Sequence, residues 1–338
     1  MGSASMKSLP ANGKSCSDRG VTVADTETMG IPVGDHAVAV QGVWRRFGSA
    51  EALRGVDFMA AAGEVTGMVG PNGAGKTTLL LILATLLAPD QGLVRIGGHD
   101  PMTETLAVRQ IMGWVPDAFG FYDNLTSQEY LAFAGAARSL PIPAAKARAT
   151  ELLELVHLDG HAERQVHLLS RGQKQRLGFA SALVHRPRVL LLDEPAAGLD
   201  PSSRLDFLRL VRQLATDGAA VIVSSHVLAD LEQVADRVVF IDRGLNVGER
   251  RIGEQPSPAH RRHWRIHALD DAVLVQAIAA LGLAGVVPGP DGVDVALDSD
   301  ASVAALIAAL VGAGVAVVSC APIETSLEAA YFELTAPE

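Results

Sequence analysis

Uninterrupted hydrophobic runs recur in the first two thirds of the chain and predict buried strands. The clearest are residues 189–192 and 220–223. Such runs are typical of central parallel strands, which helices cover on both faces. Residues 64–69 are predicted to form a further strand that enters a Gly-rich loop, and a helix is predicted directly after it over 77–87. This alternation predicts an α/β domain with a mostly parallel sheet.

A helical pattern interrupts this alternation between about residues 118 and 170. Thr126 and Glu129 have the spacing of a capping box, and an apolar stripe follows them. Pro141 and Pro143 are expected to end this helix, and a second helix is expected over 144–155. The stretch therefore predicts a helical insertion in the α/β core.

Beyond residue 250 the pattern changes. Two prolines within 253–258 mark a linker, which we place at 251–262, and a separate domain is predicted over 263–338. Its predicted elements are a strand (264–268), a helix (272–281), two short strands around 288–292, a helix (302–310), a strand (315–320) and a last helix (326–334). The β-α-β-β-α-β order favours a small ferredoxin-like α+β domain.

Composition and charge narrow the class of protein. The chain has 338 residues, 49% of them hydrophobic, and a net charge of −10. An acidic chain of this kind is not expected to bind nucleic acid through bulk charge. Residues 1–35 are rich in small polar residues and lack the apolar core of a secretory signal, so we expect a flexible leader. Two cysteines, Cys16 and Cys320, suit a reducing cytosol.

Two stretches, 272–290 and 301–323, are poor in charge and are candidates for membrane spans. A spanning helix needs about 20 apolar residues in a row. Gln276 and a Pro-Gly-Pro sequence interrupt the first stretch, and the turn signal at 312–314 divides the second. Both therefore favour helix, turn and strand, and the chain is not expected to cross a membrane alone.

The Gly-rich loop carries the first chemical motif, which has the pattern G-x-x-x-x-G-K-[ST]. It consists of Gly70, Pro71, Asn72, Gly73, Ala74, Gly75, Lys76 and Thr77, and we expect Thr78 to join its contacts. Glycines let backbone N–H groups surround phosphates, and the helix that follows directs its positive end to the same place. Lys76 would contact the β- and γ-phosphates, and the Thr77 hydroxyl would bind Mg²⁺. The alternative, a chance Gly-rich turn, is disfavoured by the strand before and the helix after.

Two acids follow the hydrophobic strand at 189–192. Parallel strands present ligands at their carboxyl ends, so Asp193 is placed to hold Mg²⁺ and Glu194 to polarise an attacking water. The alternative is a strand end with solvated acids.

A second helix whose start can accept an anion is predicted after Leu169. Ser170 would cap this helix, and Gly172 and Gln173 would contact phosphate.

Together these segments resemble ABC ATPases. Residues 70–77, 169–173 and 189–194 are similar to the Walker A, signature and Walker B motifs, in that family's order. The resemblance covers about residues 36–250 and implies a P-loop nucleotide-binding domain with antiparallel strands at its start (38–40 and 55–58). It also implies roles for three further positions: Phe47 would stack on adenine, Asp200 would belong to the D-loop, and His226 would be the switch histidine.

The resemblance implies cofactors and partners as well. ATP and Mg²⁺ would bind the loop. A second copy would pair head to tail, so that each signature helix faces the other copy's phosphate loop. A separate transmembrane permease would place the protein on the cytoplasmic face of the membrane. Glu194 would orient the water, while Lys76 and His226 would stabilise the γ-phosphate.

Two positions depart from the common ABC pattern. Asp117 stands where many cassettes have Gln, and is expected to contact Mg²⁺. Arg171 replaces a signature glycine and is expected to point to solvent. The sequence WVPDAFGFYDNLTSQEYLAF (114–133) and the ending at 326–334 resemble the ABC-2 exporter group, which is related to daunorubicin-resistance ATP-binding proteins.

This narrower resemblance implies export, with residues 117–140 as the permease contact. Three alternatives stay open: a soluble ABC ATPase, a regulatory nucleotide-binding module, and an importer ATPase. A single phosphate loop and the lack of a heptad array argue against the soluble forms, and Glu194 argues against a purely regulatory role.

Overall fold

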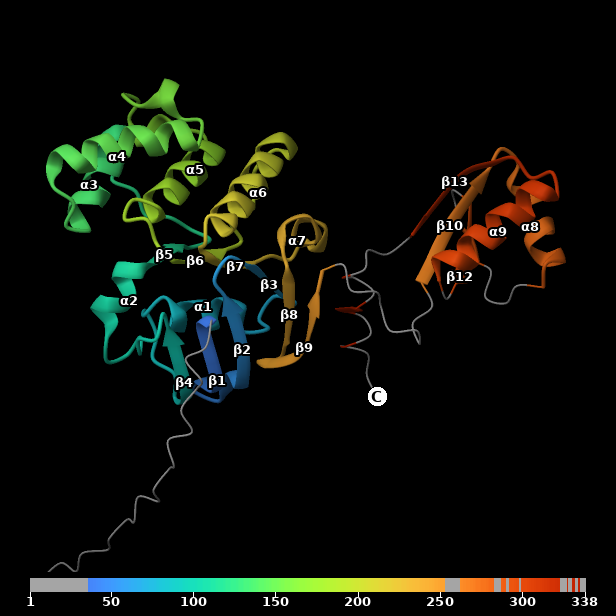
Figure 1. Cartoon of the computed structure of the whole chain (residues 1–338), viewed down its shortest axis with the longest axis horizontal. Helices are drawn as coiled ribbons and strands as arrows, with labels where there is room; N and C mark the ends of the chain where they lie inside the picture. Colours follow the sequence, from blue (N-terminus) through green and yellow to red (C-terminus); the bar gives the residue numbers. More distant parts are fainter. Residues whose placement is uncertain are drawn as a thin grey trace, which may run out of the picture. The chain divides into compact units, whose positions relative to one another are not determined.

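The computed structural model describes residues 36–252, 262–282, 287–289, 292–297 and 299–322, together with Leu327, Ala330, Tyr331 and Leu334 (Figure 1). The predicted leader and residues 253–261 of the predicted linker lie outside the described residues. Residues 36–252 form the main domain, which contains two sheets.

The larger sheet of the main domain has six strands in the order β5-β6-β7-β3-β8-β9. All of its neighbouring strands pair in parallel except β8 and β9. The strands are β3 (Val65–Val69), β5 (Met112–Val115), β6 (Val189–Asp193), β7 (Ala220–Ser224), β8 (Arg237–Asp242) and β9 (Leu245–Arg251). The predicted runs form β3, β6 and β7, which lie side by side and whose residues are all buried. The mostly parallel sheet is therefore confirmed.

A second, antiparallel sheet is formed by β1 (His36–Phe47), β2 (Ala50–Ala61) and β4 (Gln91–Ile96), in the order β2-β1-β4. The predicted antiparallel strands are confirmed, but β1 and β2 are much longer than the segments at 38–40 and 55–58. Register shifts interrupt their pairing, as between Val40 and Val43. Such bulges break the alternation of apolar residues that sequence reasoning depends on.

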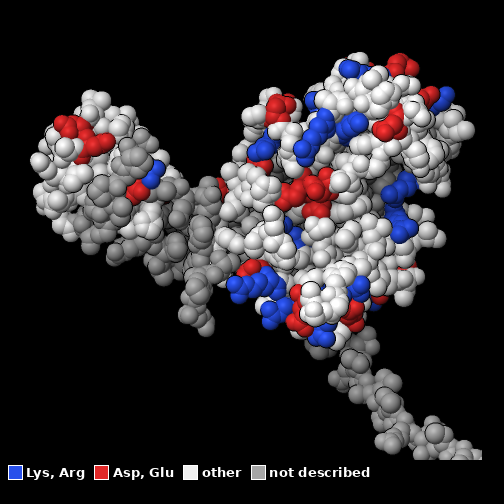
Figure 2. Space-filling model, turned by 180° about the vertical axis from the view of Figure 1, so that it is seen from behind, with Lys and Arg blue, Asp and Glu red and all other residues white. Residues whose placement is uncertain are grey.

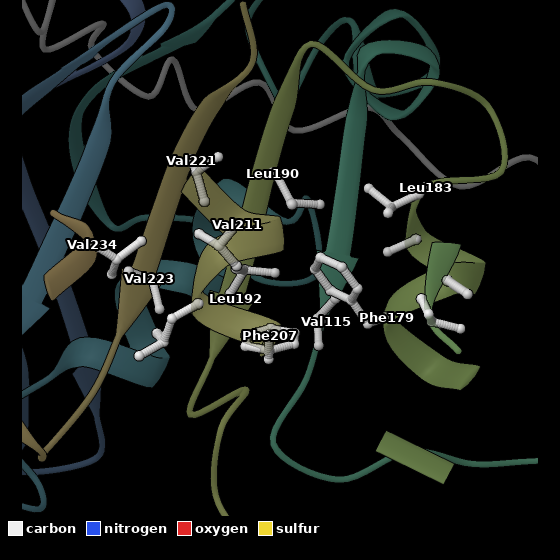
Figure 3. Packing of buried hydrophobic residues seen from close by; sticks show 14 of the residues in the cluster. Val115, Phe179, Leu183, Leu190, Leu192, Phe207, Val211, Val221, Val223 and Val234 are labelled. Atoms are coloured by element: carbon white, nitrogen blue, oxygen red, sulfur yellow. The ribbon is translucent and has the colours of Figure 1, made fainter. Parts of the chain in front are cut away.

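Helices cover both faces of the central sheet. The face toward the antiparallel sheet packs against α1 (Lys76–Leu83), and α2 (Thr105–Ile111) adds Val108 to the same core. The opposite face packs against α5 (Arg171–Ala182), α6 (Pro201–Thr216) and α7 (Leu228–Val234). Figure 3 shows Phe179 and Phe207 between these helices and sheet residues such as Leu190 and Leu192. The helices α3 (Ser127–Ala137) and α4 (Ile142–Leu155) pack on each other and on α5.

Two helix boundaries differ from the prediction. The helix after the Gly-rich loop ends at Leu83, because Thr85 adopts a positive φ of 63° that stops helical geometry. The second helix of the insertion begins at Ile142, so Pro143 lies in its first turn. A proline is tolerated there because the first N–H groups of a helix have no partner within the helix.

Beyond the linker, an antiparallel sheet has the order β11-β12-β10-β13. Its elements are β10 (Arg262–Ala268), α8 (Asp271–Ala280), β11 (Val287–Gly289), β12 (Gly292–Leu297), α9 (Asp300–Gly312) and β13 (Val317–Pro322). This β-α-β-β-α-β order agrees with the prediction, and both helices pack on one core with the sheet. The assignment of this domain as ferredoxin-like stays a prediction.

The four described residues near the C-terminus contact the main domain. Leu327 and Ala330 are buried in the same core as β8, and the rings of Tyr331 and Phe240 are 6.2 Å apart. The Leu327 N–H donates to a carboxylate oxygen of Glu232 at 2.9 Å. The predicted last helix was placed in the C-terminal domain, but these contacts tie its described residues to the main domain.

No helix within the described ranges combines the length and the apolar composition required to span a bilayer. The two charge-poor stretches instead contribute α8, α9 and strands of the C-terminal sheet. This agrees with their interpretation as helix, turn and strand.

Candidate functional site

The Gly-rich loop connects the end of β3 to the start of α1, where a cavity of about 260 Å³ opens. Close backbone packing explains the glycine at position 75, which has a φ of 109° and where an added Cβ would lie 2.5 Å from the Ala52 carbonyl oxygen. The cavity is lined by Ala52, Asn72, Gly73, Ala74, Gly75, Lys76, Thr77, Thr78, Asp117, Asp193 and Glu194. The structure thus brings the loop and the predicted carboxylates to one place.

Lys76 is buried at this cavity. Its ammonium donates hydrogen bonds to the carbonyl oxygens of Gly70, at 2.6 Å, and of Pro71, at 3.1 Å. Burial lowers the pKa of Lys76, while the nearby charges of Glu194 and Asp193 act in the opposite direction. A cation held beside the loop in this way would attract a phosphate group.

The start of α1 fits a phosphate. Its N-cap residue, Gly75, supplies no side-chain cap, and the first turn holds no acidic residue. The first N–H groups of the helix are therefore free of a capping side chain, and the helix dipole favours an anion there.

The oxygen groups beside the loop fit Mg²⁺. The Thr77 hydroxyl and the Asp193 and Asp117 carboxylates border the same cavity, and such hard oxygen ligands suit this ion. Within the described part of the chain, no three or more His, Cys, Asp or Glu side chains cluster into a metal site.

Glu194 and His226 come together from the ends of two neighbouring strands. Nδ1 of His226 lies 2.9 Å from Oε2 of Glu194. Ser224, at the end of β7, joins the two acids: its buried hydroxyl donates to Oδ1 of Asp193 at 2.6 Å and accepts the Glu194 N–H at 3.0 Å. This arrangement fixes the backbone at Glu194 and leaves its carboxylate on the cavity wall.

The signature segment lies at the start of α5, and the cavity lining does not include it. Ser170 and Gln173 form a capping box: the Ser170 oxygen accepts the Gln173 N–H at 3.3 Å, and Oε1 of Gln173 accepts the Ser170 N–H at 2.9 Å. Within the described chain, Ser170, Gly172 and Gln173 are thus separate from the phosphate loop. Their expected contact with the nucleotide of a second copy stays a prediction.

Five further predicted residues are not part of the cavity lining: Phe47, Gly70, Pro71, Asp200 and His226. Phe47, at the end of β1, is half exposed, and the Arg45 guanidinium lies 4.9 Å from the centre of its ring. Asp200 caps α6, where it accepts the Ser203 N–H at 3.0 Å and the Ser202 hydroxyl at 2.7 Å. These hydrogen bonds hold the pKa of Asp200 well below its usual range. The roles of Phe47 and Asp200 toward ATP stay predictions.

Arg171 is exposed, as expected, but its guanidinium also lies against the D-loop. A Cβ built on Gly198 would be 3.0 Å from Nε of Arg171. Two residues beside the site were not predicted from the sequence. They are Ser224 and Gln175, and the side-chain amide of Gln175 donates to the Pro195 carbonyl oxygen at 3.0 Å. Ser224 could have been found from its place at the end of a buried strand, beside the strand of Asp193.

Comparisons with known proteins identify similar ATP-binding proteins. The family model described as ABC transporter matches residues 53–197. The daunorubicin resistance ATP-binding protein DrrA3 of Streptomyces coeruleorubidus is 36% identical over 77% of this chain and 82% of its own length. The doxorubicin resistance ATP-binding protein DrrA of Mycobacterium tuberculosis is also 36% identical, over 73% and 76%.

Solved structures are similar as well. One is the dimeric structure of a post-hydrolysis state of an ATP-binding cassette bound to ADP and Pi. It has a TM-score of 0.60 and 26% sequence identity, and the match covers 64% of this chain and all of that chain. The fold and the Gly-rich loop of the main domain are therefore those of a nucleotide-binding cassette.

Proposed function

Because this chain belongs to the ATP-binding proteins of the ABC transporter family, we propose that it hydrolyses ATP to drive an ABC-2 type exporter. The relatives named for daunorubicin and doxorubicin resistance support the direction of transport. The hydrolytic part of the proposal rests on Glu194, which lines the phosphate-loop cavity and contacts His226. A regulatory module that only binds nucleotide would not need a histidine in contact with this glutamate.

The proposed reaction is an in-line attack of water on the γ-phosphorus of ATP. Glu194 accepts a hydrogen bond from the water, whose oxygen forms the new bond while the bond to the bridging oxygen of ADP breaks. His226 is oriented through its Nδ1, so its other ring nitrogen is available to the γ-phosphate. Lys76 stabilises the negative charge.

Mg²⁺, held by Thr77 and Asp193 with Asp117 nearby, would neutralise charge on the phosphates. The position of Asp117 in the cavity lining, on the segment that leads to α3, supports this role. A carboxylate there would contact the ion directly or through water.

We propose two partners for the chain. A second copy would pair with it head to tail, which is supported by the dimeric cassette structure that it resembles. A membrane permease would contact residues 117–140, which would place the protein peripherally on the cytoplasmic side of the membrane. This region exposes Tyr122 and Phe133, whose rings pack edge to face 5.1 Å apart. Exposed aromatic side chains of this kind are common at protein interfaces.

Nucleic acid is not among the proposed partners. On the face shown in Figure 2, Lys and Arg side chains lie in small groups between acidic groups and uncharged surface. A nucleic-acid interface would need a continuous basic surface. The net charge of −10 supports the same conclusion.

Replacing the proposed general base tests the hydrolytic function. We expect Glu194→Gln to lower kcat by about 100-fold or more, because the amide cannot take up the proton of the attacking water. The affinity for Mg-ATP should stay within about twofold of the wild type. Steady-state phosphate release and equilibrium binding of a fluorescent ATP analogue would measure both quantities.

Glu154→Gln is the matched control, because Glu154 is an exposed glutamate on α4. Wild-type turnover in Glu194→Gln would remove Glu194 from the mechanism.

A pull-down from native membranes, with tagged Glu194→Gln and Mg-ATP, would distinguish the transport alternatives by the proteins that it recovers. A polytopic membrane protein alone would support export, and an accompanying extracytoplasmic binding protein would indicate import. Only ribosomal or DNA-repair proteins would indicate a soluble ATPase.

A further inference from the structure

The backbone at Glu194 adopts a conformation that the sequence does not favour. Its φ is 47°, in the left-handed region that residues other than glycine rarely occupy. Pro195 follows, and a proline restricts the preceding residue to extended conformations. A residue with both features keeps its conformation only where surrounding contacts determine it.

Contacts from two elements hold this turn. From β7, the Ser224 hydroxyl accepts the Glu194 N–H at 3.0 Å. From α5, the Gln175 amide donates to the Pro195 carbonyl oxygen at 3.0 Å. Gln175 is 9% exposed, so this hydrogen bond is shielded from water.

The contact with α5 extends along residues 195–200, which we call the D-loop segment. A Cβ built on Gly198 would lie 3.0 Å from Nε of Arg171, and one built on Gly172 would lie 3.5 Å from Cδ2 of Leu199. One helix therefore touches both the beginning and the middle of the segment that follows Glu194.

The body of α5 is anchored, which makes it a rigid support. Phe179 on α5 and Phe207 on α6 pack edge to face, with ring centres 4.7 Å apart, against the central sheet (Figure 3). Both rings are buried. A displacement at the start of α5 would therefore reach Pro195 through Gln175 instead of being absorbed by loose packing.

We propose that Gln175 is a positioning residue for ATP hydrolysis, which acts by holding the Pro195 carbonyl and so aiming the Glu194 carboxylate at the cavity. Arg171 lies against the middle of the same segment, at Gly198. The signature helix thereby controls the hydrolytic carboxylate of its own chain, in addition to any contact with a second copy. This inference rests on the proposed role of Glu194.

The test uses the full-length protein with Gln175→Met, which keeps the side-chain length but removes the donor, and Gln175→Glu, which cannot donate in its ionised form. A catalytic group displaced by about 1 Å loses about 100-fold in rate. We therefore expect kcat to fall by about 10- to 100-fold in both variants, while the Kd for Mg-ATP changes less than about twofold. Gln233→Met is the control, because Gln233 is exposed and its amide donates to a carbonyl oxygen within its own helix, that of Ala229 on α7.

A double-mutant cycle separates positioning from general structural damage. If Gln175 acts through Glu194, Gln175→Met should cause no further loss in a Glu194→Gln background. Independent, multiplicative losses would overturn the inference, and so would equal losses of binding and turnover in Gln175→Met. If Glu194→Gln lowers turnover and Gln175→Met does not, the inference alone is wrong. If Glu194→Gln keeps turnover, the proposed role of Glu194 is wrong and the inference falls with it. If the wild-type protein shows no ATP turnover, the proposed function itself is wrong.

Discussion

At the scale of single residues, Ser224 joins Asp193 and Glu194, the carboxylates proposed for metal binding and for hydrolysis. Its side chain is buried and its hydroxyl forms hydrogen bonds with both residues. Ser224→Ala would leave the Glu194 N–H and an oxygen of Asp193 without this partner. We expect a loss of about 1–3 kcal/mol in the free energy of unfolding, measured by urea denaturation. Ser319→Ala, at an exposed strand position, should change it by less than about 0.5 kcal/mol.

The motifs could be predicted from the sequence at this scale, but the contacts that orient them could not. The spacing from Gly70 to Thr77 defines the loop, and Asp193 and Glu194 follow a recognisable strand. Gln175 has no motif signal of its own, because its role depends on a carbonyl group 20 residues later in the chain. The left-handed backbone at Glu194 also contradicts local propensity, as is common at functional sites.

At the scale of elements, two helices begin with the same cap but should respond differently to its loss. Thr126 caps α3 and Ser170 caps α5, each with a complete capping box. Alanine at either position should lower the free energy of unfolding by about 1 kcal/mol. Only Ser170→Ala should also lower the ATPase rate, because the N-terminus of α5 is expected to contact nucleotide. Urea denaturation and phosphate release on the same preparations measure both effects, and an equal loss of activity in Thr126→Ala would contradict this assignment.

Element types were predicted better than element boundaries. The hydrophobic runs of β6 and β7 predict a central strand clearly, since every residue in them is buried. The start of α4 depends instead on how Pro143 is accommodated, and the end of α1 depends on the conformation of Thr85. A proline is compatible with either a break or a first turn, and which one occurs is decided by packing outside the local sequence.

At the scale of the whole molecule, the main domain extends its core to residues near the C-terminus. Leu327, Ala330, Tyr331 and Leu334 recur at helical spacing, and an added Cβ on Gly248 would lie 2.7 Å from Leu334. Leu327 is 1% exposed. Leu327→Ala should therefore cost about 2–5 kcal/mol, because it opens a cavity in the core that β8 shares.

Hydrogen exchange locates this effect within the molecule. In Leu327→Ala, amide protection should fall in α7, β8 and β9, because these elements lose packing against the C-terminal residues. Leu281→Ala is the control, since Leu281 follows α8 and is 46% exposed. If exchange rose only in α8, α9 and the sheet they cover, Leu327 would belong to the C-terminal domain and the contacts with β8 would not persist in solution. Exchange confined to the main domain would show that residues at the far end of the chain complete the core of the cassette.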